Sequence, residues 1–98
     1  MYELIIKDEA KLEIIDAYHW YESMQEDLGE RFLNELDNCF DRMCLSPEIF
    51  PRKHKDMRQV VMKVFPFVII FEIEEDAVVV YAVFNTYRDP GKLLDRYD

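Results

Sequence analysis

The densest group of cationic side chains lies just past the middle of the chain. Five basic residues stand there against the single acid Asp56: Arg52, Lys53, Lys55, Arg58 and Lys63. Clustered Lys and Arg side chains bind phosphate groups and release counterions, so this segment predicts a small basic face. His54 lies in the same run. We interpret it as a solvated loop residue, with acid–base catalysis as the alternative.

The chain as a whole is acidic, with a formal net charge of -9. Residues 1–50 hold four basic and thirteen acidic side chains, whereas residues 51–98 hold eight of each. The net negative charge therefore belongs to the first half of the chain. Because an acidic surface repels nucleic acid, any phosphate-binding role would be confined to the basic face.

The length and composition predict one globular domain over residues 1–98. A chain of 98 residues has room for one hydrophobic core, and half of its residues are apolar. The longest apolar run, Val64 to Phe71, is far shorter than the roughly 20 residues of a membrane-spanning helix. The N-terminus lacks the basic region and cleavage site of a secretion signal, so we expect a cytoplasmic protein without a membrane partner.

The two cysteines are expected to be core residues. Cys39 and Cys44 are five residues apart within a predicted helix, where their side chains diverge too much for a disulfide. Neither a zinc-ligand spacing nor a cofactor-binding motif is present in the sequence. We therefore predict no metal and no cofactor.

The first half of the chain predicts a short strand and two helices. The strand covers Tyr2 to Ile6, and Asp8 is the expected N-cap of a helix that ends near Gln25. Its apolar stripe is Ala10, Ile14, Ala17, Tyr18, Tyr21 and Met24, with Trp20 off the stripe. A second helix follows Gly29 and ends before Ser46-Pro47; its stripe is Phe32, Leu33, Leu36, Cys39, Phe40 and Met43. The short connection makes the helices antiparallel.

The second half predicts three sequential strands, because the apolar period changes there from about 3.6 to 2. They cover Met57–Val64, Phe67–Glu74 and Ala77–Asn85, and the tail from Thr86 to Asp98 is expected to be partly mobile. Short turns between the strands imply an antiparallel meander. The predicted fold is therefore α+β, in the order β-α-α-β-β-β, with two antiparallel helices on one face of a mostly antiparallel four-stranded sheet.

Short motifs spread over residues 1–90 resemble the RelE/ParE toxins of bacterial type II toxin–antitoxin systems. They occur in family order: Glu9-Ala10, Ala17, Trp20-Tyr21-Glu22, Leu28-Gly29, Arg31-Phe32-Leu33, Pro47, Phe50-Pro51, Arg58, Phe65-Pro66-Phe67, Ile69, Ala82-Val83-Phe84 and Arg88-Asp89-Pro90. The Trp-Tyr-Glu, Leu-Gly-x-Arg-Phe and Phe-Pro-Phe elements look more like ParE-type plasmid stabilisation proteins. The resemblance implies a toxin that inhibits growth and is neutralised by a cognate antitoxin.

Branches of this family differ in target. ParE-like members act on DNA gyrase by protein contact, whereas RelE-like members cut mRNA on the ribosome. For ParE-like action we name Trp20, Arg58 and Arg88 as partner-binding residues. Trp20 is included because an exposed aromatic on an acidic helix is a plausible protein contact. A second copy of the chain could fill the apolar groove when the antitoxin is absent.

The RelE-like alternative needs cations for the phosphate and an acid or base for proton transfer. Arg58, Lys63 and Arg88 are the candidate cations, and Tyr87 is the candidate acid or base. Their structural alternatives are an ion pair for Arg58 and a packing role for Tyr87.

Two observations weigh against nuclease chemistry. Asn85 stands where many family members carry His, and the asparagine amide cannot shuttle protons at neutral pH. The acidity of the chain also opposes RNA binding. We therefore favour a protein that is not an enzyme, and a third alternative is a non-toxic homologue that retains only antitoxin binding.

Overall fold

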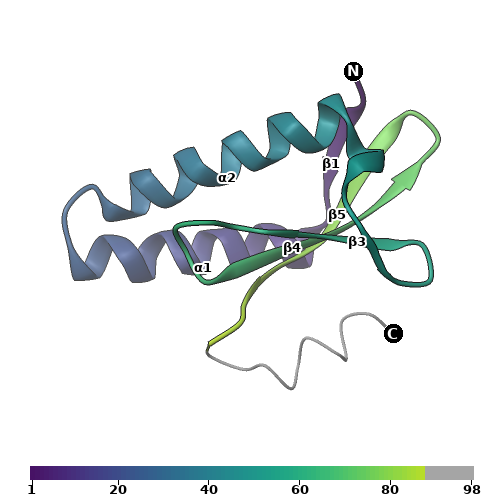
Figure 1. The fold of residues 1–98 in the computed structure, drawn as a ribbon. Coiled ribbons are helices and arrows are strands. Elements are labelled where there is room, and N and C mark those ends of the chain that lie inside the picture. The colour runs from purple at the N-terminus through teal and green to yellow at the C-terminus, as the bar shows by residue number, and fades with distance from the viewer. Residues whose placement is uncertain (88–98) are drawn as a thin grey trace.

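The computed structural model describes residues 1–87, and Figure 1 shows the long helices beside a twisted sheet. The elements are β1 (Glu3–Ile6), α1 (Asp8–Met24), α2 (Leu28–Leu45), a 3-10 turn η1 (Pro47–Ile49), β2 (Arg52–His54), β3 (Met57–Val61), β4 (Phe67–Glu74) and β5 (Ala77–Asn85). The predicted class, the antiparallel pair of helices and the order β-α-α-β-β-β are confirmed. The sheet has five strands where four were expected.

The sheet is mixed, with the strand order β1-β5-β4-β3-β2. Three neighbouring pairs are antiparallel, as predicted for a meander, and β1 runs parallel to β5. The helices that follow β1 carry the chain away before it returns through the other strands. As a result, the first and last strands lie side by side, and β1 forms one edge of the sheet.

The additional strand, β2, is formed by the basic run that the sequence analysis treated as a loop. Arg52 pairs with Arg58 and His54 pairs with Met57, with a register irregularity between them. Lys55 adopts a positive φ of 54°, which closes the turn into β3. Three polar residues carry no alternating apolar pattern, so sequence periodicity did not detect this strand.

The predicted strand Met57–Val64 is shorter in the structure, where β3 ends at Val61. The amide of Met62 donates to the carbonyl of Phe67 at 3.0 Å, and the chain then turns through Pro66 into β4. Val60 and Met62 are buried, whereas Val64 is 57% exposed. Val64 is exposed because it lies in the turn beyond the strand.

Both helices begin earlier than the sequence suggested. Asp8 is the first residue of α1 instead of its N-cap, and Lys7 holds the cap position without a side-chain hydrogen bond. The carboxylates of Asp8 and Glu9 still favour the positive end of the helix dipole. The predicted stripe of α1 is confirmed at Ala10 and Ala17, which are buried. Met24 is 62% exposed, contrary to expectation, because it is the last residue of α1.

Glu22 and Gly29 fix the junction between the helices. Asp27, with a φ of 68°, holds the N-cap position of α2, and Gly29 is the second residue of that helix. The Glu22 carboxylate accepts from the amides of Asp27 at 3.1 Å and Gly29 at 3.0 Å. A Cβ on Gly29 would lie 2.7 Å from the carbonyl oxygen of Tyr18. The two helices therefore lie close together at Gly29, because glycine has no side chain to hold them apart.

The core lies between the helices and one face of the sheet. Four aromatic rings meet at its centre: Tyr21, Phe32, Phe65 and Phe67. The centroid of Phe32 lies 5.4 Å from that of Phe65 and 5.0 Å from that of Phe67. The four rings join both helices to the turn between β3 and β4. Cys39 and Cys44 are also buried, as free thiols, as predicted.

A bulge in β5 at Tyr81 reverses which residues face the helices. Val80 pairs with Phe71, and Ala82 pairs with Ile70, so Tyr81 is the extra residue that β5 carries between these two pairs. Beyond the bulge, the edge of β5 is no longer covered by β1, which pairs only as far as Val80. The amide of Val83 instead donates to the Glu13 carboxylate at 3.0 Å. This hydrogen bond joins α1 to the part of β5 that does not pair with β1.

Candidate functional site

Arg58 donates hydrogen bonds to two main-chain oxygens. It lies on β3, and its Nη1 donates to the carbonyl of Phe50 at 2.6 Å and to that of Glu48 at 3.3 Å. Charged donors make strong hydrogen bonds to carbonyl oxygens. The guanidinium therefore holds the segment between η1 and β2 against the sheet, which is a structural role.

We expect Arg58→Ala to lower the free energy of unfolding by about 1.5–3 kcal/mol, because two carbonyls lose a charged donor. Urea unfolding followed by circular dichroism would measure this change. Arg52→Ala is the matched control. The Arg52–Asp56 ion pair is long, at 3.6 Å, and both of its side chains are mostly exposed, so it should contribute less than about 1 kcal/mol. Equal losses in the two variants would contradict the structural role of Arg58.

The remaining basic residues of the segment lie along the outer strand. Lys53 and Lys55 are exposed, and Arg52 forms an ion pair with Asp56. His54 is half-buried within β2, so its interpretation as a solvated loop residue is wrong. Together these residues form a basic edge on an acidic molecule.

Lys63 and Tyr87 lie at the end of the sheet where β3 turns into β4, which is opposite the turn between β2 and β3. Lys63 is exposed in the turn between β3 and β4, and Tyr87, which follows β5, is 84% exposed. The amide of Thr86 donates to the carbonyl of Pro66 at 2.9 Å, which brings the end of β5 to the same turn. Arg58 lies three residues before the end of β3, a distance of about 10 Å along the strand. The candidate catalytic residues Arg58, Lys63 and Tyr87 are therefore not brought together at one end of the sheet. Arg88 lies outside the described residues.

Asn85 is the last residue of β5. Its Oδ1 accepts from the amide of Tyr87 at 2.9 Å. The asparagine side chain thus shapes the turn that follows the strand.

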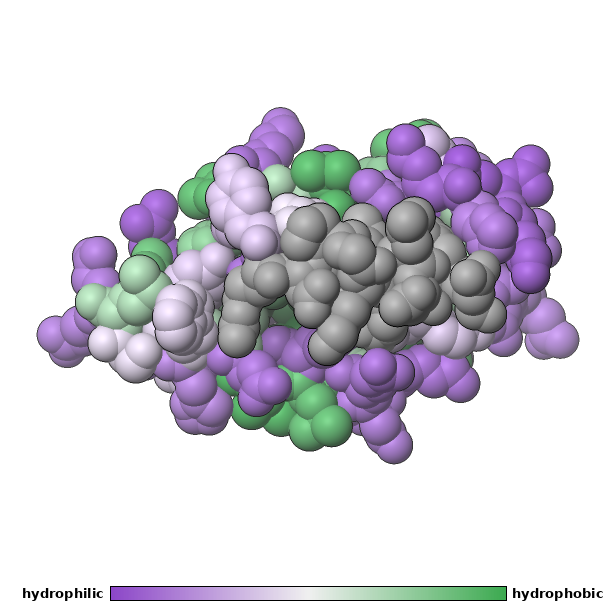
Figure 2. Space-filling view, turned by 90° about the horizontal axis from the view of Figure 1, so that it is seen from below, coloured by the Kyte–Doolittle hydropathy of each residue, from purple (hydrophilic) through white to green (hydrophobic). Residues whose placement is uncertain are grey.

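Trp20 lies on α1 with half of its surface exposed, as its place off the buried stripe predicted. Other apolar side chains on the same helix are also exposed, namely Leu12, Ile15 and Met24. Figure 2 shows one face of the molecule, on which apolar side chains appear as separate green patches between hydrophilic ones. Trp20 is the aromatic member of this exposed set, and aromatic residues are enriched in binding hot spots.

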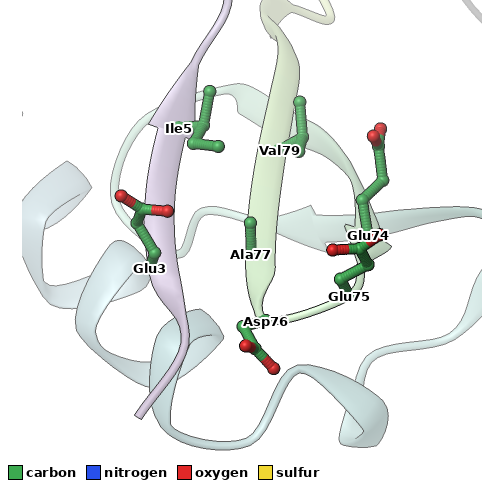
Figure 3. A pocket seen from close by; sticks show the side chains of 7 residues that line it. All are labelled: Glu3, Ile5, Glu74, Glu75, Asp76, Ala77 and Val79. Carbon is green, nitrogen blue, oxygen red and sulfur yellow. The ribbon is translucent and has the colours of Figure 1, made fainter.

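A pocket of about 450 Å³ lies where β1, β5 and the β4–β5 turn meet. Its lining residues are Glu3, Ile5, Glu74, Glu75, Asp76, Ala77 and Val79. Figure 3 shows Ile5, Ala77 and Val79 on the two neighbouring strands, with carboxylates around them. Sequence reasoning missed this pocket, because β1 and β5 are neighbours only through the parallel pairing. The run Glu74-Glu75-Asp76 was its only signal.

Tyr81, at the bulge, is held by a carboxylate and a cation. Its hydroxyl donates to Oε2 of Glu74 at 2.7 Å, and Nζ of Lys7 lies 5.8 Å from the centre of its ring. The hydrogen bond to Glu74, together with burial, raises the pKa of Tyr81 to about 12. The phenol therefore stays neutral throughout the physiological range.

Replacing Glu74 by Gln is expected to lower the pKa of Tyr81 toward its ordinary value near 10. The raised pKa stabilises the fold fully below pH 10, and this contribution is lost as the pH rises from about 10 to about 12. Ultraviolet titration of tyrosinate, with Tyr81→Phe to assign the signal, would measure the shift. An unchanged Tyr81 pKa in Glu74→Gln would contradict the assigned hydrogen bond.

The described part of the chain offers little for nucleophilic or metal chemistry. Burial raises the pKa of the Cys44 thiol, which makes it a weak nucleophile at neutral pH. Among residues 1–87, no three His, Cys, Asp or Glu side chains are placed to hold a metal ion. Within the same range, neither helix is long and apolar enough to span a membrane.

Comparisons with known proteins agree with the fold described above. A solved structure titled "Chromosomal ParDE TA system from P. aeruginosa" superimposes with a TM-score of 0.63 at 13% sequence identity, covering 87% of this chain and 96% of that chain. At this identity the likeness concerns the fold. No curated protein matches the sequence. Residues 4–90 match the family model described as the ParE toxin of the type II toxin–antitoxin system, parDE. Because the match spans most of the sequence, the chain belongs to the ParE toxin family of type II toxin–antitoxin systems.

Proposed function

We propose that the chain is the toxin of a bacterial toxin–antitoxin module, which inhibits growth by binding a protein target such as DNA gyrase and is neutralised by a cognate antitoxin. The observation that carries the proposal is the family match over residues 4–90. The similar solved structure is itself titled as a ParDE toxin–antitoxin system, which supports an antitoxin as partner.

The arrangement of the candidate residues favours protein contact over RNA cleavage. Arg58 is engaged with two carbonyl oxygens, and Lys63 and Tyr87 lie at a different end of the sheet. A general acid or base must reach the reacting group to within hydrogen-bond distance. Trp20, by contrast, is half exposed on α1, where a protein partner can contact its ring.

Two other functions follow from particular residues. Lys63, Tyr87 and Arg88 would take part in a RelE-like ribosome-dependent cleavage of mRNA, and a conformational change would have to bring Arg58 to Lys63 and Tyr87. Asn85, with its side chain used in a turn, is also compatible with a non-toxic homologue that retains antitoxin binding.

The test is controlled induction of the chain alone in bacteria, followed by DNA synthesis and mRNA integrity over time. We expect growth to stop, DNA synthesis to fall first and transcripts to remain intact. Co-expression of the protein encoded next to the toxin should restore growth. Codon-dependent mRNA cuts would replace the gyrase proposal by the RelE-like alternative, and normal growth at high expression would replace it by the non-toxic one.

Trp20→Ala and Leu12→Ala form a matched pair for this test. Both side chains are exposed on α1, at 50% and 62%, so neither change should unfold the protein. We expect Trp20→Ala to weaken growth inhibition and Leu12→Ala to retain it. Equal toxicity of both variants would remove Trp20 from the partner-binding surface.

A further inference from the structure

Two turns with opposite charges lie at one end of the sheet. Arg58 of β3 pairs with Phe71 of β4, and Val61 pairs with Val68, so β4 ends on the side where β3 begins. The β2–β3 turn and the β4–β5 turn therefore lie at the same end, and both are on the right in Figure 1. We call this region the turn end of the sheet.

The turn end is basic on one side and acidic on the other. On the outer strand and its turn, Lys53 and Lys55 are exposed, and the nearby Asp56 is ion-paired with Arg52. The pocket beside β1 lies on the other side, and none of its seven lining residues is basic. Its acidic residues are Glu3, Glu74, Glu75 and Asp76. Carboxylates gathered in a concave site concentrate a negative potential that attracts cations.

The strand order makes this charge pattern complementary to itself. In the order β1-β5-β4-β3-β2, two strand spacings separate the β4–β5 turn from the β2–β3 turn, a distance of about 10 Å. A two-fold axis between β3 and β4, normal to the sheet at the turn end, reverses the strand order in a second copy. Each β2–β3 turn then faces the β4–β5 turn of the other copy. The same contact is therefore made twice, as a two-fold dimer requires.

We propose that the chain forms a two-fold dimer through the turn end, in which Lys53 and Lys55 of each copy meet the acidic pocket of the other. The lysine ammonium groups lie among the carboxylates, and the apolar lysine stems cover the floor of the pocket. That floor consists of Ile5, Ala77 and Val79 (Figure 3).

The dimer is independent of the toxin's target. Trp20 lies on α1, which begins beyond the opposite end of β1 from Glu3. The contact at the turn end therefore leaves Trp20 exposed in both copies. Failure of the dimer would leave the proposed toxin function standing, and failure of the toxin function would leave the dimer standing.

The net charge of -9 on each copy sets how the dimer responds to salt. At about 0.1 M salt the Debye length is about 10 Å, so repulsion between distant carboxylates is screened more than attraction between adjacent charges. At about 1 M salt the Debye length falls to about 3 Å, and the contact itself weakens. We therefore expect a transient dimer that dissociates at high salt, in keeping with an interface made of turns.

Charge reversal on each side, followed by mixing, tests the proposal. Sedimentation velocity of the full chain at about 0.1 M salt should show monomer and dimer in reversible exchange. Lys53→Glu with Lys55→Glu, and separately Glu3→Lys with Glu75→Lys, should each weaken dimerisation about tenfold or more, because both contacts lose their attraction. A mixture of the two variants should dimerise more strongly than either alone. In the mixed dimer, one contact has its native charges and the other is no longer repulsive.

A matched control separates the contact from net charge alone. Lys11→Glu with Arg31→Glu makes the same charge change on exposed helix positions and should leave dimerisation nearly unchanged. Circular dichroism would establish that each variant is folded. A wild-type chain that stays monomeric, equal losses in the control, or a mixture no more dimeric than its components would overturn the proposal. So would species larger than a dimer, because they would reveal an open head-to-tail contact in place of the two-fold one.

Discussion

Phe32→Ala is expected to lower the free energy of unfolding by about 3–5 kcal/mol, as large-to-small changes in cores do. The Phe32 side chain is fully buried and contacts the rings of Tyr21, Phe65 and Phe67. Its removal leaves a cavity where both helices meet the β3–β4 turn. A domain of this size has about 5–15 kcal/mol of stability in total, so the variant should unfold at a much lower urea concentration.

Two further variants separate the effect of the cavity from a general loss of aromatic residues. Phe32→Leu keeps most of the buried volume and should lose only about 1–2 kcal/mol. Tyr87→Ala removes a ring that is 84% exposed and should stay within about 0.5 kcal/mol of the wild type. If Phe32→Ala lost no more stability than Tyr87→Ala, Phe32 would not be the centre of the core.

The residues that revealed the family are largely packing residues. Phe32 and the Phe65-Pro66-Phe67 turn form the aromatic centre, and Glu22 with Gly29 forms the helix junction. Such positions are constrained by the fold, so motifs at these positions indicate a shared architecture. They carry no information on the target, because one fold can serve different functions.

Periodicity predicted the regular elements with clear apolar faces. β4 and β5 have the predicted bounds, and Phe67, Ile69 and Phe71 lie in the core. Periodicity did not predict the elements that depend on contacts between residues distant in the sequence. β2 is polar and exists only through its pairing with β3, and the start of α2 depends on the carboxylate of Glu22.

The candidate site was less predictable than the fold. Sequence reasoning found Arg58 and Trp20, but the role of Arg58 as a donor to the carbonyls of Glu48 and Phe50 required the tertiary structure. The pocket beside β1 was missed because its two halves are more than 60 residues apart in the chain. A parallel pairing between the first and last strands leaves no local signal in sequence.

Gly29→Ala is expected to destabilise the protein by about 1–3 kcal/mol, although alanine favours helices over glycine. The new Cβ would lie 2.7 Å from the carbonyl oxygen of Tyr18 and 2.9 Å from its ring atom Cδ1. A backbone oxygen cannot rotate away as a side chain can, so α1 and α2 would have to separate. That movement would also stretch the hydrogen bond from the Gly29 amide to Glu22.

Asn34→Ala is the control for helix propensity, because Asn34 is exposed within the same helix. It should be neutral or stabilising by less than about 0.7 kcal/mol, the difference in propensity between the two residues. Thermal unfolding of both variants and the wild type would give the comparison. The close contact predicts opposite directions for the two alanine substitutions. If both raised the stability, the helices would be free to adjust their spacing, and Gly29 would be no more than a weak position in α2.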